Sequence, residues 1–267
     1  MRQGRGMAGP RVSLTWWSFA DRGVAAGELI RAVAAMGYDG IELADEALWP
    51  AIAEAGLAIV SHRGHGTIES GLNRPENHDR IEAEILTNLD LARRWDIPLL
   101  ICFSGSREEL SAEAGIENTA LGLSRVARAA EQADVTLALE LLNSKIDHPD
   151  YQCDRTTWGL EVIARVDSAR VRLLYDVYHM QVMEGDLIRT IQAHHDAFAH
   201  YHVAGNPGRH EPDRSQEISY PAIYEAIAAT GFAGYVGMEY LPRAGVVESL
   251  RAALDDFRAA TRVMGDG

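Results

Sequence analysis

Short apolar runs alternate with longer segments of helical periodicity along almost the whole chain, and this alternation restricts the fold more than any other feature. Each run is typical of a buried strand. The segments between them carry apolar residues three or four positions apart, as amphipathic helices do, for example Ile81, Ile85 and Leu89. We therefore expect eight strands, at residues 11–17, 40–44, 57–62, 98–105, 135–143, 171–179, 198–205 and 235–241.

Eight strand–helix units in a chain of 267 residues predict an α/β fold of the (β/α)8 TIM barrel type. A doubly wound open sheet is the alternative, and it usually carries a Gly-rich phosphate-binding sequence after an early strand. The stretch GRGMAG at 4–9 instead precedes the first strand. Because composition shifts nowhere along the chain, we expect one barrel domain at 12–267 behind a flexible tail at 1–11.

The balance of charge restricts the partners. Asp and Glu number 39 against 25 Lys and Arg, a formal net charge of -14, which disfavours nucleic acid and anionic lipid surfaces. No run of about 18 apolar residues predicts a membrane span, and no apolar segment follows the basic N-terminus as in a secretion signal. Two cysteines without paired spacing fit a reducing cytoplasm. We expect a cytoplasmic protein with a small-molecule substrate; pairing into a homo-oligomer stays open.

Polar side chains end four consecutive strands of the predicted barrel. They are Glu140, Asp176, His202 and Glu239. Active sites of such barrels lie at the carboxyl ends of the strands, so these side chains should meet at one rim. Each carboxylate alone could be a helix N-cap or an ion-pair partner, but three crowded carboxylates repel one another unless a cation joins them. Mixed oxygen and imidazole ligation favours one Mn²⁺, Mg²⁺ or Co²⁺ over a structural zinc.

Further candidates flank this rim. Arg209, in HVAGNPGRHEP, offers a planar fork of donors for a carboxylate or sugar oxygens, unless it is a solvated loop residue. His62 and His65, in SHRGHGT, follow the third strand and either contact substrate or face solvent. Trp16 and Trp17 end the first strand, where alternation would place one at the rim and one in the wall. We take Trp16 as the rim residue.

Two segments of the chain resemble each other weakly. GYDGIEL at 37–43 and GFAGYVGMEY at 231–240 both combine a helix-ending Gly, a Gly turn and a strand that carries Glu. The offset of the Glu differs between them. We interpret the similarity as a repeated strand–helix pattern.

The four polar residues, together with Asp-x-x-His at 176–179, resemble the xylose isomerase-like barrel superfamily of sugar isomerases and epimerases. Within it, ELLNSKIDHPDYQCD, YDVYHMQVMEGD, HYHVAGNPGRHE, GYVGMEYLP, GLNRPENHDRIE and LLICFSG resemble the hydroxypyruvate isomerase family, and the similarity covers about residues 12–260. The resemblance implies one divalent metal on the four residues, with Glu140 and Glu239 also forming the acid/base pair. It implies that His179 and Arg209 hold substrate oxygens.

The resemblance predicts an intramolecular oxidoreductase that converts hydroxypyruvate to tartronate semialdehyde, or acts on a similar small keto acid or ketose. The segment SHRGHGTIESG departs from the loop expected in hydroxypyruvate isomerases, so the substrate stays open. A ketose 3-epimerase, a lyase acting on an oxidised sugar and a sugar-binding protein without catalysis are the alternatives. The superfamily's three-zinc DNA-repair endonucleases need further His ligands, which CFSG at 102–105 does not offer.

Overall fold

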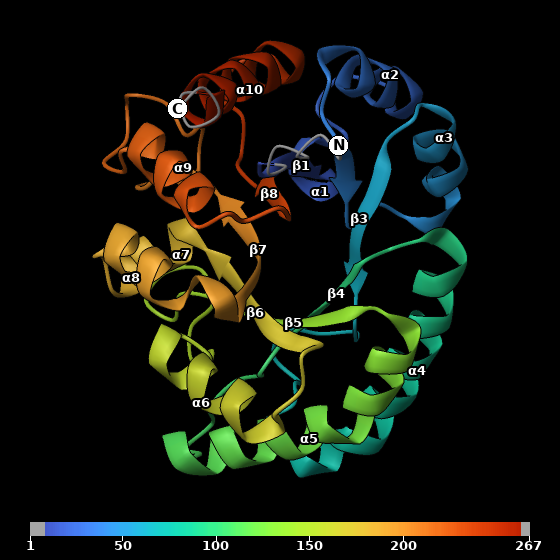
Figure 1. Ribbon diagram of the computed structural model, residues 1–267, viewed down its shortest axis with the longest axis vertical. Helices are drawn as coiled ribbons and strands as arrows, with labels where there is room; N and C mark the ends of the chain where they lie inside the picture. The colour runs from blue at the N-terminus through green and yellow to red at the C-terminus, as the bar shows by residue number, and fades with distance from the viewer. Residues whose placement is uncertain (1–8, 263–267) are drawn as a thin grey trace, which may run out of the picture. The chain divides into compact units, whose positions relative to one another are not determined.

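The structure is a computed structural model that describes residues 9–262. Most of the predicted tail, 1–11, lies outside the described residues, and Arg11 already belongs to the first strand. Eight strands follow one another around a closed barrel in chain order, which confirms the predicted fold class (Figure 1). The strands are β1 (Arg11–Thr15), β2 (Gly40–Glu42), β3 (Ala58–Arg63), β4 (Leu99–Cys102), β5 (Thr136–Glu140), β6 (Val171–Asp176), β7 (Phe198–Val203) and β8 (Tyr235–Met238).

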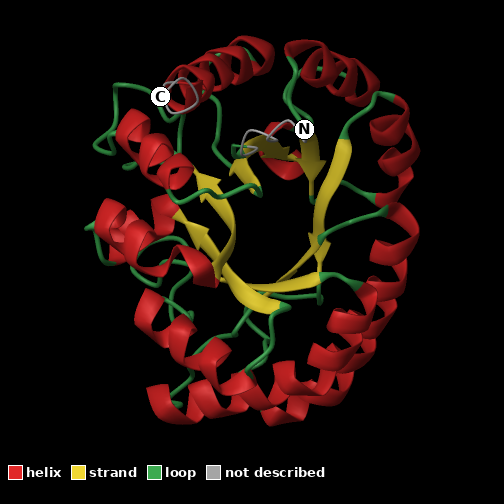
Figure 2. Cartoon of the chain, viewed as in Figure 1, coloured by secondary structure: helices red, strands yellow, loops and turns green. Residues whose placement is uncertain are grey.

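Helices connect these strands and alternate with them along the chain (Figure 2). The α-helices are α1 (Trp16–Phe19), α2 (Ala26–Met36), α3 (Trp49–Glu54), α4 (His78–Trp95), α5 (Ala112–Ala133), α6 (Thr156–Val166), α7 (Val177–Met183), α8 (Leu187–His194), α9 (Tyr220–Ala229) and α10 (Val246–Arg262). Short 3-10 turns are η1 (Glu46–Leu48), η2 (Pro75–Asn77) and η3 (His195–Ala197). Within residues 9–262, no helix has the combination of length and apolar character that crossing a bilayer requires.

The described residues form two compact parts. The terminal part comprises residues 9–58, 186–196 and 202–262, and the central part comprises 59–185 and 197–201. In the terminal part, β1 pairs in parallel with both β2 and β8, and α10 packs against α9 and α2. In the central part, β3, β4, β5 and β6 form a continuous parallel run, against which α4, α5 and α6 pack.

Three helices of the central part end in the same way. The residues that follow α4, α5 and α6 are Asp96, Asp134 and Asp167, with φ of 53°, 58° and 52°. Asp tolerates this left-handed conformation better than most residues, because its short side chain can bond to the local backbone. The Asp therefore ends each helix in a turn, and the next strand begins a few residues after it.

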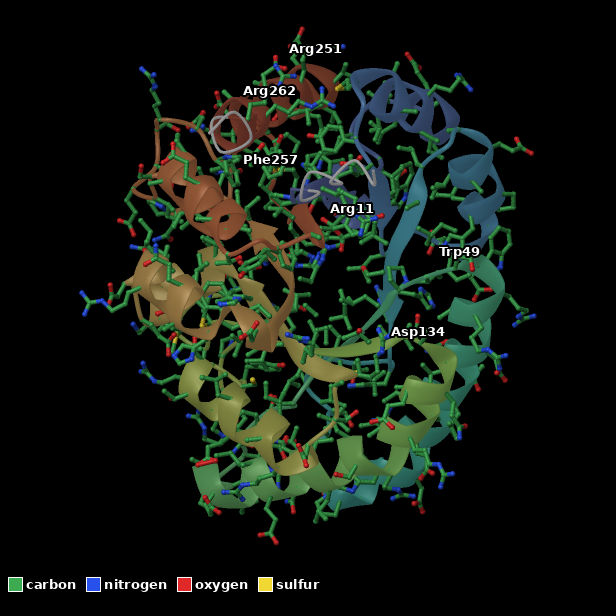
Figure 3. The ribbon with its side chains drawn as sticks, in the orientation of Figure 1. Arg11, Trp49, Asp134, Arg251, Phe257 and Arg262 are labelled. Carbon is green, nitrogen blue, oxygen red and sulfur yellow. The ribbon has the colours of Figure 1, made fainter. Side chains whose placement is uncertain are left out.

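Large side chains fill the space between strands and helices. In the terminal part, Phe257 of α10, labelled in Figure 3, meets the ring of Tyr224 of α9 edge to face, with 5.1 Å between centroids. Trp49, at the start of α3, is buried and donates its indole N–H to the carbonyl of Ala44. Such rings bury 150–250 Å² each, so they supply much of the hydrophobic stabilisation.

Seven of the eight predicted strands end two or three residues before the expected position, and in two of them a helix begins at once. The strand expected at 11–17 stops at Thr15, and Trp16 begins α1. The strand expected at 171–179 stops at Asp176, whose carboxylate accepts a hydrogen bond from the backbone N–H of His179 and so caps α7. An Asp in this position satisfies a helical N–H that has no partner within the helix, and this cap competes with continued strand.

Candidate metal centre and substrate residues

A buried chain of polar groups runs through the terminal part. The register pairs Thr15 of β1 with Glu42 of β2, so Ser13, two residues earlier, lies on the same side as Glu42. The Ser13 hydroxyl donates to Glu42 Oε1 at 2.5 Å, and Glu42 Oε2 lies 3.3 Å from Nε2 of His202. The other ring nitrogen of His202, Nδ1, lies 3.3 Å from Glu239 Oε2. Glu42 therefore holds Nε2 and leaves Nδ1 directed toward Glu239.

Glu239 is also held by a cation and an indole. The Arg209 guanidinium forms an ion pair with Glu239 Oε2 at 2.5 Å, and Trp17 Nε1–H donates to Glu239 Oε1 at 3.2 Å. The guanidinium carbon lies 5.3 Å from the centre of the Trp17 ring. Trp17, which is 43% exposed, is thus the indole that reaches this carboxylate, whereas Trp16, predicted at the rim, is 7% exposed. The strand alternation does not apply because both residues belong to α1.

In the central part, the strand register places two carboxylates on one side of the sheet. Glu140, the last residue of β5, pairs with Leu174 of β6. Asp176 follows Leu174 by two residues, so its side chain projects to the same side as those of Leu174 and Glu140. Both carboxylates are buried, at 5% and 1% exposure.

His179 lies one helical turn after Asp176, inside α7 and not at a strand end. Its Nδ1 accepts a hydrogen bond from the backbone N–H of Asn143 at 3.2 Å and lies 2.6 Å from the side-chain amide of the same residue. Nδ1 therefore acts as an acceptor, which places the proton of the neutral ring on Nε2. Nε2 lies 3.6 Å from Asp176 Oδ2. This arrangement fixes a neutral imidazole donor beside a buried carboxylate.

The two histidines predicted near the end of the third strand both lie in the central part. His62 belongs to β3, and His65 follows it. His65 Nε2 accepts a hydrogen bond from the backbone N–H of Phe103 at 2.9 Å. Burial lowers the pKa of His65 to about 4. On α4, the charge of Glu84 acts to raise this pKa and the charge of Arg80 acts to lower it. The ring is therefore neutral near pH 7, and the structure places it beside Phe103 and α4.

Sequence reasoning missed Glu42 and Trp17. Glu42 lies in GIEL, one of the two similar segments, and we interpreted its position as part of a repeated pattern. The signal was nevertheless present, because a strand that is buried along its length carries a carboxylate only where a partner balances it. No comparable signal distinguishes Trp17 from Trp16, since both side chains are large and apolar.

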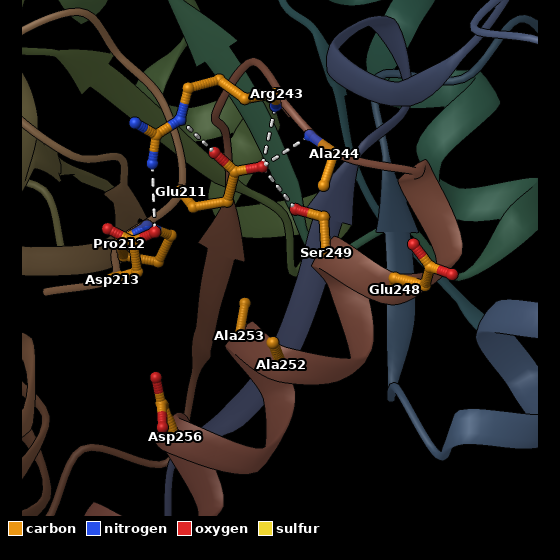
Figure 4. Close-up of a pocket in the computed structure, with 10 residues that line it drawn as sticks. All are labelled: Glu211, Pro212, Asp213, Arg243, Ala244, Glu248, Ser249, Ala252, Ala253 and Asp256. Carbon is orange, nitrogen blue, oxygen red and sulfur yellow. Dashed lines mark hydrogen bonds and ion pairs between the residues drawn. The ribbon is translucent and has the colours of Figure 1, made fainter. Parts of the chain in front are cut away.

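The loop that carries Arg209 is fastened to the loop after β8. Glu211 accepts hydrogen bonds from the backbone N–H and the guanidinium of Arg243, at 2.8 and 3.0 Å, and from the Ser249 hydroxyl at 3.0 Å (Figure 4). Burial acts to raise the pKa of Glu211. The hydrogen bonds from the backbone, Arg243 and Ser249 outweigh burial and lower this pKa to about 2.

This depressed pKa predicts a dependence of stability on pH. At pH 7 we expect Glu211→Gln to lower the free energy of unfolding by about 2 kcal/mol, because the carboxylate loses its charge-assisted bonds. The contribution is present above the usual Glu pKa and is lost as pH falls through about 4.5 toward the folded pKa of about 2. Urea unfolding of both proteins at pH 7 and pH 3 measures it. An equal difference at both pH values would contradict this origin.

The residues at these strand ends have the chemistry of cation ligands. Glu140 and Asp176 in the central part, and His202 and Glu239 in the terminal part, are buried and offer carboxylate or imidazole atoms. Within the terminal part, the 3.3 Å between His202 Nδ1 and Glu239 Oε2 is close to the spacing of neighbouring ligands around a cation with bonds of about 2.1 Å. Buried carboxylates are costly without compensating positive charge, so this donor set fits a divalent metal.

Comparison with known proteins defines the class. The family model of the xylose isomerase-like TIM barrel matches residues 30–257, so the chain belongs to that family. A 2-oxo-tetronate isomerase from Cupriavidus necator is 35% identical over 128 residues, 48% of each chain. The match thus spans about half the length of that relative.

Two further comparisons extend over most of the chain. A human protein named as a candidate hydroxypyruvate isomerase is 28% identical over 237 residues, 83% of this chain and 86% of that protein. The solved structure of an AP endonuclease, family 2, from Brucella melitensis superposes with a TM-score of 0.79 at 26% identity, covering 90% of this chain and 96% of that one. The predicted superfamily is confirmed, and the relatives named as isomerases agree with the prediction of an isomerase enzyme.

Proposed function

We propose that the protein is a metal-dependent isomerase of a short 2-oxo acid with a hydroxyl group on C3, most directly hydroxypyruvate, which it converts to tartronate semialdehyde. Glu140, Asp176, His202 and Glu239 are the proposed ligands of one divalent cation. Support comes from family membership, because in barrels of this kind the carboxyl ends of the strands share one rim. The relatives named hydroxypyruvate isomerase and 2-oxo-tetronate isomerase support a keto acid as substrate.

The ion pair between Arg209 and Glu239 is the observation that favours a carboxylic acid as the substrate. A guanidinium held 2.5 Å from a proposed ligand lies where a substrate that reaches the metal also has to lie. Its planar fork of donors matches a carboxylate, and the pairing is stronger than a hydrogen bond between neutral groups. Arg209 would bind the substrate carboxylate, while His179, with its proton on Nε2, would donate to a substrate oxygen.

The reaction moves a proton between neighbouring carbons. One of Glu239 and Glu140 takes the proton from C3, and the other returns a proton to C2; the C3 hydroxyl releases a proton while the C2 oxygen gains one. Removal of the C3 proton is difficult because that C–H is a weak acid. A bound divalent cation would hold the carbonyl and hydroxyl oxygens together and stabilise the negative charge of the enediolate.

Glu42 would act through His202. By accepting from Nε2–H it fixes the tautomer in which Nδ1 carries the lone pair that a cation would bind. We expect Glu42→Gln to weaken Mn²⁺ binding about 10- to 100-fold, because such outer partners orient and polarise a ligand imidazole. Titration calorimetry of the metal-free protein measures this, with Glu54→Gln, an exposed residue of α3, as the control. Equal affinity in the wild type and Glu42→Gln would remove Glu42 from this role.

A matched pair of substrates tests the proposed function. Dihydroxyacetone has the reacting carbons of hydroxypyruvate but a neutral hydroxymethyl group in place of the carboxylate. We expect the Mn²⁺-loaded protein to isomerise hydroxypyruvate, and to prefer it by about 10-fold or more in kcat/KM, as loss of a charged contact predicts. Arg209→Met should abolish the preference, and Arg214→Met, an exposed residue of the same loop, should keep it. A wild type that turns over neutral ketoses better than the acid would contradict the proposal and favour an epimerase.

A further inference from the structure

We infer that Glu211 is a positioning residue for the substrate-binding Arg209, and that it acts through a clamp made of Glu211, Arg243 and Ser249. This inference rests on the proposed function, in which Arg209 binds the substrate carboxylate. Glu211 belongs to the loop after β7 and Arg243 to the loop after β8, while Ser249 lies in α10. The clamp therefore joins three elements of the terminal part at one buried carboxylate.

Both carboxylate oxygens of Glu211 accept hydrogen bonds from neighbouring segments of the terminal part. It is 9% exposed, and its Oε1 accepts from the Arg243 backbone N–H, the Ser249 hydroxyl and, at 3.4 Å, the Ala244 backbone N–H. Its Oε2 accepts from Arg243 Nε at 3.0 Å. A buried carboxylate that loses such donors pays the full cost of desolvation, so these bonds hold the two loops in one arrangement.

Arg243 extends the clamp to the rest of the loop after β7. Its Nη2 donates to Asp213 Oδ2 at 3.0 Å and to the Ser215 hydroxyl at 2.7 Å. Arg243 lines a pocket of about 410 Å³ on this side, together with Glu211 and Asp213 (Figure 4), and its side chain is 46% exposed. One face of the clamp is thus open to solvent, and the face toward Ser249 is buried.

Backbone hydrogen bonds between the loops after β7 and β8 connect the clamp to Arg209. Leu241 N–H donates to the carbonyl of Arg209 at 2.7 Å, and the His210 ring nitrogen Nδ1 lies 2.9 Å from the carbonyl of Leu241. The loop closes on itself where Gly205 N–H donates to the carbonyl of His210 at 2.8 Å. A Cβ atom at position 205 would lie 2.5 Å from the Glu211 carbonyl oxygen, so the backbones of Gly205 and Glu211 approach closely and Gly is required there.

Arg209 itself needs this support. Its φ of 56° is left-handed, a conformation that costs free energy for a residue with a side chain. Such a conformation persists where surrounding contacts determine it, and here the Leu241 contact at the Arg209 carbonyl and the Glu211 contacts two residues later supply them. The clamp therefore sets the direction in which the guanidinium extends toward Glu239 and Trp17.

A double-mutant cycle tests whether Glu211 acts through Arg209. In the Mn²⁺-loaded protein with hydroxypyruvate, we expect Glu211→Gln to lower kcat/KM about 10-fold, as loss of one well-placed charged contact does. In the Arg209→Met background the same substitution should change kcat/KM less than about twofold, because the residue it positions is absent. Glu113→Gln, which removes an exposed ion pair with Arg165, serves as the control and should leave kcat/KM unchanged. Additive effects of Glu211→Gln and Arg209→Met would overturn the inference.

A second measurement needs no substrate and so separates this inference from the proposed function. The indole N–H of Trp17 contacts Glu239 and lies beside Arg209, so its ¹⁵N–¹H resonance reports where the guanidinium is. We expect Glu211→Gln to shift this resonance in the direction that Arg209→Met shifts it, with Trp17→Phe providing the assignment. An unmoved resonance in Glu211→Gln would overturn the clamp. A wild type without isomerase activity would overturn only the proposed function.

Discussion

Glu239→Gln is expected to lower kcat for hydroxypyruvate by about 10³-fold or more while the protein stays folded. An amide cannot accept the proton from C3, and general base catalysis contributes 10² to 10⁴-fold to such reactions. The substitution keeps the shape of the side chain and an oxygen that can accept from the Trp17 indole. Steady-state kinetics of the metal-loaded variant, with circular dichroism to check folding, measure the effect.

The control for this experiment is Glu225→Gln, an exposed residue of α9 that lies outside the proposed site. It should have the kcat of the wild type. Metal content of Glu239→Gln has to be measured as well, because Glu239 is also a proposed ligand, and turnover is compared per bound metal. Activity within tenfold of the wild type at equal metal content would contradict the assignment of Glu239 as an acid/base residue.

Asp176→Ala is expected to lose the bound metal. The carboxylate is one of the four proposed ligands and is 1% exposed, so water cannot freely take its place. It also caps α7 through the His179 N–H, and removal of an Asp cap costs about 1 kcal/mol of stability. Asp176→Asn separates these effects, because its amide oxygen can still cap the helix but carries no charge for a cation.

Elemental analysis by mass spectrometry after dialysis against Mn²⁺ and then metal-free buffer measures the metal bound per chain. Asp176→Ala and Asp176→Asn should both retain well under half of the wild-type metal, and Asp176→Ala alone should also unfold at lower temperature. The control is Asp186→Asn, an exposed residue that precedes α8. Full metal content in both Asp176 variants would remove this residue from the ligand set.

The sequence predicted the order of elements well because each barrel unit is encoded locally. A run of buried residues followed by a helical pattern, such as β4 and α5, needs no long-range information to be recognised. The ends of elements were harder to predict. The apolar run Leu173–Tyr175 favours a strand that continues, but the side chain of Asp176 caps a helix that begins at the next residue. The sequence alone does not show whether this cap or continued pairing with a neighbouring strand is the more stable.

Residues of the candidate site could be predicted where an acidic residue directly follows an apolar run. Glu140 and Glu239 follow apolar runs directly, so they could be placed at strand ends from the sequence. Trp17, Glu42 and Glu211 could not be assigned in this way. Their roles depend on partners far along the chain: Trp17 bonds to a residue 222 positions away, and Glu42 to one 160 positions away. Such pairings depend on how distant segments of the chain meet in the fold, which a single sequence does not specify.

Proton exchange in D₂O tests the central claim, that the protein moves a proton between the two carbons beside the carboxylate of a keto acid. Hydroxypyruvate is incubated with Mg²⁺-loaded protein, with metal-free protein and with Glu239→Gln, and proton NMR follows the C3 signal. The account predicts metal-dependent loss of the C3 protons to deuterium and the appearance of tartronate semialdehyde deuterated at C2, well above both controls. No exchange above the controls, with the metal bound, would contradict it.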